Sequence, residues 1–496
     1  MNFKLLGKLL GILLLLESVA MMACGVFAYF DQSPHHEDAT MALMTSSGLT
    51  AFIGVLLCLS GLGKTERIPR REGMVVVGAG WIFFGFFGAL PFILAAPYLD
   101  PASALFESIS GFTTTGSTVI GSLSEWPRGI LLWRAVTQWL GGLGILVLFV
   151  ALLSSIGVGS KSLFRAESSL QTGEATAARI RDTANSLLKV YLFFTACSIV
   201  VLHGLGMTWF DSVAHSFTAV STGGFSPHDA SIGHFSGWKT GLWIEIWLSI
   251  VMTACSLNFL LYPMLFQNRW KRIRANEEGR WFLIIVVGSM LLMAVGLCLE
   301  NGDWREFGTH LRHTSFITTS IISTTGFGSV DYEMWPAFLL VILASIMLVG
   351  GCAGSTSGGM KVSRLLVFLK AIRHDVIRAY RPNQVFRTQM NGRSISENLR
   401  AQTVLFVALY GFIFLGGAMM VSLLEAGNGI DLLTSFGAVI ATLANIGPGF
   451  GDVGPTENFA HFRPVTHVFL SMLMILGRLE LFAILVMFVP ALWRKY

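Results

Sequence analysis

The sequence predicts an all-α polytopic membrane protein in which four similar helical units surround one pore. Composition is the first observation, because 53% of the 496 residues are hydrophobic and only 13% are charged, a balance too apolar for a water-soluble domain. The second is a set of ten apolar runs, each long enough for a membrane helix of roughly 20 residues. The third is a short polar segment that occurs four times, always between two of these runs.

The ten apolar runs set the order of the predicted membrane passages. They lie near 3–30, 40–63, 74–97, 129–156, 187–209, 238–266, 279–300, 334–378, 399–425 and 464–491. The first two passages, within 1–72, enclose no polar segment, so we expect them to be two extra N-terminal transmembrane helices. Residues 3–30 also resemble a signal peptide, but an even count of passages requires that they be retained.

After residue 72, the order helix, re-entrant pore half-helix, filter, helix (M1-P-M2) is predicted to repeat four times around a pseudo-fourfold pore. The pore repeats are 73–157, 187–267, 279–378 and 399–492, with cytoplasmic links at 158–186 and 379–398. Repeats of this kind indicate that each copy supplies one quarter of a central site. Half-helices are expected to begin at Asp100, Asp211 and Asp431, whose carboxylates suit a helix N-cap, and near His310.

The distribution of charge predicts the orientation of the chain. Most of the 34 lysines and arginines lie in loops on one side of the ten-pass arrangement, and the positive-inside rule makes that side cytoplasmic. Both termini are then cytoplasmic and the filters face outside. This asymmetry accounts for the net charge of +5, so no nucleic-acid partner is indicated. The basic segments 158–186 and 370–398 suit contact with lipid headgroups or a cytosolic partner.

The four polar segments have the composition of an ion-selectivity filter. They are Thr114-Thr115-Gly116, Ser221-Thr222-Gly223, Thr324-Thr325-Gly326 and Asn445-Ile446-Gly447. A pore that removes water from a cation must supply oxygens instead, and consecutive backbone carbonyls do so only where glycine allows unusual dihedral angles. Each half-helix would also direct the partial negative charge of its C-terminus towards the ion path. The alternative is that the glycines serve only tight turns at loop ends.

A glycine- and serine-rich stretch interrupts the apolar run 334–378. It reads Gly350-Gly351-Cys352-Ala353-Gly354-Ser355-Thr356-Ser357-Gly358-Gly359. Non-helical backbone at membrane depth is tolerated only where protein covers it or where it lines a water-filled path, so we expect this loop in the pore below the filter. A phosphate-binding loop is excluded, because Met360 rather than lysine follows and no strand precedes.

Together these features resemble the Trk/Ktr/HKT superfamily of potassium transporters, and within it the bacterial TrkH-type membrane subunit. The resemblance covers essentially the whole chain and is carried by 107–118, 220–226, 323–329 and 444–451. It implies that potassium is the transported ion, because all four filters have glycine in the third position. It also implies uptake across the bacterial inner membrane, no catalysis, and no organic cofactor bound by this chain.

The resemblance further implies a gate and partners. The gate would be the loop residues Gly350, Gly351, Gly354, Ser355, Thr356, Ser357, Gly358 and Gly359, with Arg478 in the pore beside them. Arg478 would raise the barrier for a cation and donate hydrogen bonds to loop carbonyls, unless it forms a structural ion pair with Glu480 or Glu245. The implied partners are membrane lipid, a second copy in a homodimer, and a separate TrkA-like cytosolic regulatory subunit that binds nucleotide.

Three other functions remain alternatives at this stage. The chain could be the potassium-translocating membrane subunit of an ATP-driven pump. It could be an intramembrane serine protease using Ser355 or Ser357, although no histidine is placed to face either hydroxyl. It could be an ion-coupled symporter of another substrate, against which only the four filters argue. Passive and proton- or sodium-coupled potassium transport both stay open.

Overall fold

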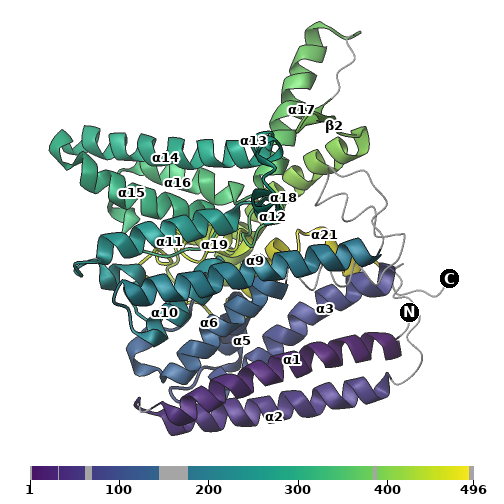
Figure 1. The fold of residues 1–496 in the computed structure, drawn as a ribbon, viewed down its shortest axis with the longest axis vertical. Coiled ribbons are helices and arrows are strands. Elements are labelled where there is room, and N and C mark those ends of the chain that lie inside the picture. Colours follow the sequence, from purple (N-terminus) through teal and green to yellow (C-terminus); the bar gives the residue numbers. More distant parts are fainter. Residues whose placement is uncertain (1–2, 32, 62–69, 145–176, 384–387, 491–496) are drawn as a thin grey trace.

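The computed structural model describes residues 3–31, 33–61, 70–144, 177–383 and 388–490, and most of them are helical. The helices lie side by side in one body, from which α17 (Val362–Tyr380) projects (Figure 1). The end of the predicted passage 129–156 and most of the predicted link 158–186 fall outside the described residues. The last part of that link, from residue 177, is already helical.

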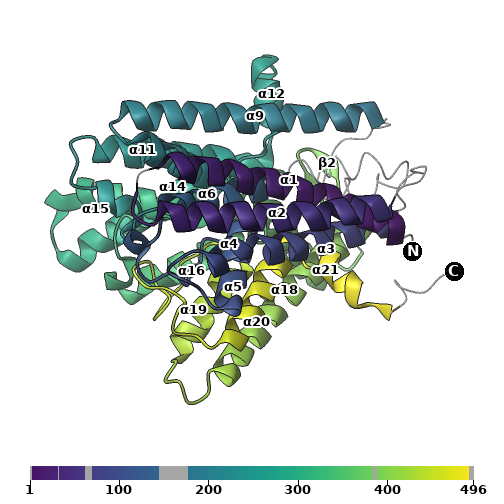
Figure 2. The same cartoon turned by 90° about the horizontal axis from the view of Figure 1, so that it is seen from below.

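The two N-terminal helices, α1 (Phe3–Phe30) and α2 (His36–Ser60), form a hairpin that confirms the prediction of two extra transmembrane helices. They lie along one edge of the body in Figure 1 and in front of the pore repeats in Figure 2. Glycines allow the two backbones to approach closely, because a Cβ on Gly11 would lie 2.6 Å from the carbonyl oxygen of Gly54.

Four helical repeats follow the hairpin, which confirms the predicted fold class. The first contains α3 (Arg70–Gly88), α4 (Leu90–Leu94), α5 (Pro101–Phe112) and α6 (Arg128–Leu143). The second contains α9 (Ala177–Gly204), α10 (Trp209–Val220), α11 (Gly241–Ser256) and α12 (Leu261–Phe266). The third contains α14 (Glu277–Asn301), α15 (Phe307–Ile322), α16 (Ala337–Val349) and α17. The fourth contains α18 (Glu397–Leu424), α19 (Leu432–Leu443), α20 (Pro464–Arg478) and α21 (Phe482–Leu485).

Short elements connect these helices. They are α13 (Trp270–Arg274), the 3-10 turns η1 (Leu123–Glu125), η4 (Ser231–Phe235), η5 (Trp304–Glu306), η6 (Tyr332–Met334) and η7 (Val486–Phe488), and the strands β1 (Gln389–Met390) and β2 (Arg393–Ser394). The two strands pair in an antiparallel hairpin. It precedes α18, the first helix of the fourth repeat.

In the second, third and fourth repeats the second helix is too short to cross a membrane by itself. The helices α11, α16 and α20 contain between 13 and 16 residues. The described part of α6 ends at the edge of a described range. The predicted passages 238–266 and 464–491 were expected to be continuous and are each divided. In the latter, Glu480 and Leu481 take φ values of 56° and 61°, which end the helix. Apolar composition does not report such backbone reversals, and this is why hydropathy missed the two breaks.

The repeats close into a ring in chain order. The second helix of each repeat packs on the half-helix of the next: α6 on α10, α11 on α15, α16 on α19, and α20 on α5. The second helices also approach their own half-helices very closely. A Cβ on Gly141 would lie 1.9 Å from the Phe112 carbonyl oxygen, and one on Gly477 would lie 1.9 Å from that of Leu443. The four half-helix C-termini therefore meet at the centre.

The starts of the half-helices agree with the sequence in two repeats and differ in two. Asp100 and Asp431 are N-caps, accepting from backbone N–H groups of the first turn. In the second repeat the cap is Thr208, whose hydroxyl accepts from the N–H of Asp211. The third half-helix begins at Phe307 rather than near His310, directly after η5, where Asp303 caps a 3-10 turn. In the second repeat Asp211, one turn after the true start, was taken for the cap.

Six of the described helices are long and apolar enough to cross a membrane: α1, α2, the α3–α4 segment, α9, α14 and α18. Four shorter apolar helices accompany them: α11, α16, α19 and α20. Large apolar side chains remain exposed along the long helices, for example Val200 and Phe412. Such surfaces suit lipid rather than water.

Candidate functional site

Each of the four half-helices ends in the same backbone turn. In the first repeat the N–H of Thr114 donates to the Gly111 carbonyl at 2.9 Å, and the N–H of Thr115 donates to that of Ser110 at 2.8 Å. This is the Schellman pattern, which requires a left-handed residue just after the helix and usually finds glycine there. Here the left-handed residues, with φ between 51° and 58°, are Thr114, Thr222, Thr324 and Asn445.

Threonine in this conformation is unfavourable, because its branched Cβ crowds the following carbonyl at a cost of roughly 1–2 kcal/mol. Three of the four turns nevertheless use it. All four side chains are fully buried at the ends of the half-helices. Strain maintained at matching positions indicates that the direction of these side chains and of the following carbonyls matters for function.

The turns also correct the predicted register of the second filter. In the second repeat the N–H of Thr222 donates to the Ala219 carbonyl at 3.2 Å and that of Gly223 to the Thr218 carbonyl at 2.8 Å. Thr222 and Gly223 are therefore the equivalents of Thr114 and Thr115, whereas Ser221 is the C-cap of α10. The first filter residue of this repeat is one position later than predicted.

The matching glycine of the second repeat is consequently Gly224, whereas comparison of the four polar segments in the sequence indicated Gly223. It has φ +83°, whereas Gly223 does not adopt positive φ. The other three glycines of this set, Gly116, Gly326 and Gly447, have φ values of +90°, +81° and +107°. Because Gly223 and Gly224 are adjacent, the sequence alone does not show which of them matches the other three glycines. The residue at which the half-helix ends decides for Gly224.

These four glycines form a closed ring of backbone contacts. A Cβ on Gly116 would lie 2.3 Å from the carbonyl oxygen of Gly223, and a Cβ on Gly224 would lie 1.8 Å from that of Thr325. The corresponding distances are 1.9 Å from Gly326 to the Ile446 oxygen and 3.0 Å from Gly447 to the Thr115 oxygen. Each repeat thus presses its glycine against a carbonyl of the next, and no side chain fits between them.

Different side chains support each quarter of the ring. Gln138 of α6 donates to the Gly223 carbonyl at 2.7 Å and accepts from the Phe225 N–H at 3.0 Å. The Ser117 hydroxyl donates to the Gly447 carbonyl at 2.8 Å. The Asn445 amide donates to the Thr115 hydroxyl at 2.9 Å. The backbone is therefore fourfold in pattern, whereas its supports are not.

A buried ion pair holds the first half-helix. Arg134 of α6 donates to Glu107 of α5 at 2.7 Å, and both side chains are buried. Glu107 also accepts from the Val119 N–H and the Thr118 hydroxyl, each at 3.0 Å. Glu107 thus ties its half-helix to the backbone that follows the first filter. Arg134 extends the tie to the second filter through the Ser226 carbonyl at 3.1 Å.

The interrupted segment of the third repeat forms a buried irregular loop, as its composition predicts. The turn starts at Gly350, with φ 73°, and ends at Lys361, with φ 71°. Its backbone is satisfied by the end of α11: the Cys352 N–H donates to the Ser256 carbonyl at 2.8 Å, and the Gly354 carbonyl accepts from the Phe259 N–H at 3.0 Å. The loop is thereby attached to the second repeat.

The loop contacts three of the four filter segments at their left-handed residues. The Thr324 hydroxyl accepts from the Gly358 N–H at 2.6 Å. The Thr222 hydroxyl is 3.4 Å from that of Thr356. A Cβ on Gly358 would lie 2.9 Å from the Cβ of Asn445. The hydroxyl of the fourth residue, Thr114, is buried without a hydrogen-bond partner.

Two buried cations bind adjacent carbonyls of this loop. Arg478, at the end of α20, donates to the Thr356 carbonyl at 2.8 Å. Lys361 donates to the Ser357 carbonyl at 2.9 Å. The Nε and Nη2 atoms of Arg478 and the Oδ1 atom of Asn445 are buried without protein partners, so this region offers both donors and acceptors to water or an ion.

Within the described residues Arg478 forms no ion pair with Glu480 or Glu245. Glu480 pairs with Arg364 of α17, and Glu245 pairs with Arg312 at 2.6 Å. The protease alternative also finds no support. The Ser355 and Ser357 hydroxyls lie 2.7 Å apart. Within the described ranges no histidine nitrogen bonds to either of them.

An acidic group lies near the fourth filter, in the turn η6 outside the membrane helices. Glu333 accepts from the Gly451 N–H at 2.5 Å. Burial raises the pKa of Glu333, the nearby carboxylates of Asp331, Glu457 and Asp452 raise it further, and the Gly451 bond opposes them.

Sequence reasoning missed several members of this site. Gly224 was missed because Gly223 precedes it. Lys361 was missed because it lies at the edge of the loop. Gln138 and Ser117 support filters of other repeats, which one chain read in order does not reveal. A useful signal was present for Lys361, because a lysine next to an intramembrane loop needs an oxygen partner.

The fold and the site define a membrane protein whose four helical repeats surround a central ring of glycines and backbone carbonyls. The family profile described as "TrkH: Cation transport protein" matches residues 40–495. The Trk system potassium uptake protein TrkH of Halomonas elongata is 34% identical over 498 residues, covering 100% of both chains. The protein of the same name from Escherichia coli K12 is also 34% identical, over 499 residues and 100% of both chains.

A solved structure agrees with these relatives. The crystal structure of the potassium transporter TrkH from Vibrio parahaemolyticus superimposes with a TM-score of 0.87 at 32% identity, covering 100% of both chains. The chain belongs to the TrkH family of cation transport proteins.

Proposed function

We propose that this chain carries potassium into the cell across the bacterial inner membrane, through the ring of four filters. The observation that carries the proposal is the closed set of contacts among Gly116, Gly224, Gly326 and Gly447, each against a carbonyl of the next repeat. The names of the full-length relatives, which are potassium uptake proteins, support the same ion.

Physical chemistry favours a weakly hydrated monovalent cation in such a ring. Backbone carbonyls replace water most easily around an ion that holds its water loosely. The four half-helices add partial negative charge from their C-termini. A side chain in place of any of the glycines would displace a neighbouring carbonyl and change the set of oxygens offered to the ion.

The loop 350–359 would be the gate in this proposal. Its contacts with Thr222, Thr324 and Asn445 support a closed arrangement directly behind the filter. Arg478 and Lys361 would hold the loop in place by binding its carbonyls. Their positive charges would also oppose passage of a cation, so release of the loop would remove both a steric and an electrostatic barrier.

Regulation would come from a separate subunit. We assign both termini and the projecting helix α17 to the cytoplasm, on the basis of the lysine and arginine distribution. A cytosolic nucleotide-binding subunit would bind there and change the position of the loop. Two copies of the membrane chain would form a homodimer, each with its own pore.

Flux into liposomes that contain the purified chain tests the proposal. Potassium and rubidium should enter well above sodium in the wild type. Gly116→Ser should raise sodium entry relative to potassium, because the new side chain must displace the Gly223 carbonyl. The matched control is Gly411→Ser, at a glycine whose Cβ would meet nothing within 4 Å.

Two outcomes would contradict the proposal. Equal entry of sodium and potassium in the wild type would show that the ring of four filters does not select potassium. No cation flux in any condition, even with nucleotide and cytosolic proteins added, together with co-purification of a P-type ATPase chain, would favour the pump subunit.

A further inference from the structure

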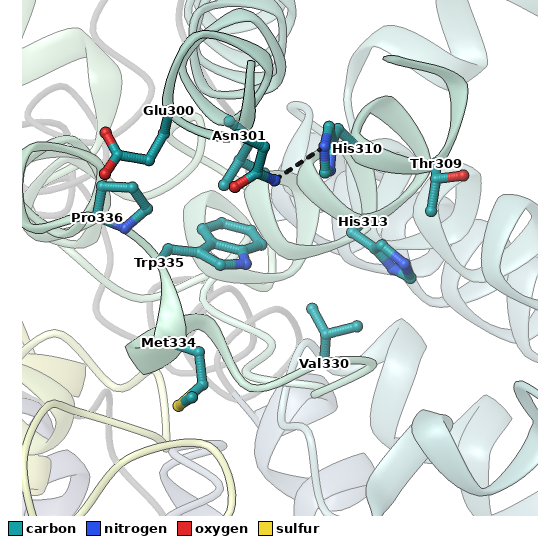
Figure 3. Close-up of a pocket in the computed structure, with 10 residues that line it drawn as sticks. Glu300, Asn301, Thr309, His310, His313, Val330, Met334, Trp335 and Pro336 are labelled. Carbon is teal, nitrogen blue, oxygen red and sulfur yellow. Dashed lines mark hydrogen bonds between the residues drawn. The ribbon is translucent and has the colours of Figure 1, made fainter. Parts of the chain in front are cut away.

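A pocket of about 500 Å³ lies in the third repeat, and its lining includes Val330, which directly follows the filter stretch 323–329. It is formed where α14 ends, α15 begins and η6 leads into α16. Figure 3 shows the Trp335 ring in the middle of the pocket, with Asn301, His310 and His313 on one side of it and Glu300 on the other. The pocket therefore joins an aromatic surface to three kinds of polar group.

The place of this pocket is the boundary of the membrane. The span α14 ends at Asn301, and α16 begins two residues after Trp335. Tryptophan is enriched at this depth because its ring suits the headgroup region. Apolar side chains beside the pocket point outwards, including Met334, which is 83% exposed, and Val341 on α16. A ligand here could keep its polar end in the pocket and its apolar end in lipid.

The polar groups distinguish two ends of such a ligand. Glu300 is the acidic residue that lines the pocket. In Figure 3 its carboxylate lies beside Pro336 and is turned away from the Trp335 ring, and such a carboxylate suits an ammonium group. On the other side, Asn301 and His310 lie 3.3 Å apart, and the Nδ1 atom of His313 is buried without a partner. Imidazole and amide N–H groups suit phosphate oxygens.

We propose that this pocket binds the headgroup of an aminophospholipid, with its ammonium at Glu300 and its phosphate at the Asn301, His310 and His313 side. The Trp335 ring separates the two ends, and the acyl chains lie along the exposed apolar faces of α14 and α16. The occupant is a zwitterionic lipid of the phosphatidylethanolamine type. This site is independent of the filter, so the proposal does not rest on the transported ion.

Lipid titration of the purified, delipidated full-length chain in detergent tests the site. Phosphatidylethanolamine should raise the thermal unfolding midpoint more than phosphatidylglycerol or phosphatidylcholine, and should be retained in native mass spectrometry. Glu300→Gln should weaken phosphatidylethanolamine binding about tenfold, which corresponds to the loss of one charge-assisted hydrogen bond. Trp335→Leu should weaken binding of both zwitterionic lipids.

The control is Glu37→Gln, which removes an exposed carboxylate at the start of α2 and should leave lipid binding unchanged. Equal responses of the wild type and Glu300→Gln would overturn the site. Equal responses to the three lipids would also overturn it. A response to free phosphoethanolamine as strong as the response to the lipid would replace the lipid with a soluble ligand. Without added lipid, wild type and Glu300→Gln should unfold at the same temperature, so a folding defect is recognised.

Discussion

At the scale of single residues, the four left-handed positions after the half-helices show what the sequence contains and what it conceals. The polar triplets identify four filters, because hydroxyl, amide and glycine residues recur between apolar runs. The register of a triplet depends on where its half-helix ends, and a serine can serve as either C-cap or filter residue. Ser221 is the C-cap, so the second filter was predicted one residue early.

These positions also differ in what their side chains do. Thr114 has a buried hydroxyl without a partner, whereas the Thr324 hydroxyl accepts from the loop at Gly358. Thr114→Gly should therefore raise the free energy of unfolding by up to about 1 kcal/mol, because glycine tolerates positive φ. Thr324→Gly gains the same relief but loses the bond to the loop, so it should be neutral or destabilising and should raise flux.

Thermal unfolding in detergent and potassium flux in liposomes, measured on both variants, check this pair. If the two variants had the same unfolding temperature and the same flux, the hydrogen bond from Gly358 to Thr324 would not contribute to holding the loop in place. The order of ion selectivity is a second measurement. It should stay the same in both variants, because neither substitution changes a ring glycine. A change in the order of ion preference would place the threonine side chains in the ion path.

At the scale of elements, the loop between α16 and α17 was predicted well and its attachments were not. Ten small and polar residues cannot continue an apolar helix, so the sequence predicts the break. The partners of the loop come from α11, α15, α19 and α20, which belong to three different repeats. Contacts between distant segments have no local signature, so one chain read in order does not predict them.

Removing the attachments of the loop should open the path. Arg478→Ala and Lys361→Met each delete a charged hydrogen bond to a loop carbonyl, worth about 1.5–3 kcal/mol. Each should raise cation flux by tenfold or more if the loop limits it, and deletion of 352–358 should do the same. The order of ion selectivity should not change, because the ring is untouched. Flux in liposomes measures both properties.

Lys271→Ala is the control for this set, because Lys271 is an exposed cation on α13. It should leave flux unchanged. Normal insertion of each variant is verified by recovery of folded protein. Unchanged or lower flux in all three loop variants would return Arg478, Lys361 and the loop to a purely structural role.

At the scale of the whole molecule, the repeats close in the order in which they occur in the chain. Periodic polar segments and apolar runs predict four quarters around one axis, and the contacts from α6 to α10, α11 to α15, α16 to α19 and α20 to α5 complete the ring. Hydropathy did not predict that the second helices α11, α16 and α20 stop short. Their ends depend on close backbone contacts such as that of Gly477 with Leu443, which are properties of the assembled fold.

Regulation through α17 can be tested on the whole molecule. Arg373 and Arg378 are exposed on this projecting helix. Changing both to glutamine should weaken binding of the proposed cytosolic nucleotide-binding subunit several-fold, most strongly at low salt, because exposed charges act through screened electrostatics. Basal flux should not change. Binding measured at two salt concentrations, with flux in parallel, checks this.

The matched control carries the same loss of charge on α13, through Arg272→Gln and Arg274→Gln. If both pairs of substitutions weakened binding equally, net charge rather than α17 would determine docking. If neither pair had an effect, the regulatory subunit would bind elsewhere.

The attachment of one loop to three unequal quarters has a consequence for stoichiometry. A pore built from four identical chains has four copies of every loop and side chain, all at the same distance from the axis. When the four quarters are one chain, each can diverge alone, and a single loop and a single arginine suffice. The Thr114 hydroxyl of the first quarter has no hydrogen-bond partner among the described residues, so under the proposed gating this quarter would keep its shape whether the loop is in place or withdrawn. Breaking the symmetry of the duplicated unit would then allow one quarter to move while another holds the ion.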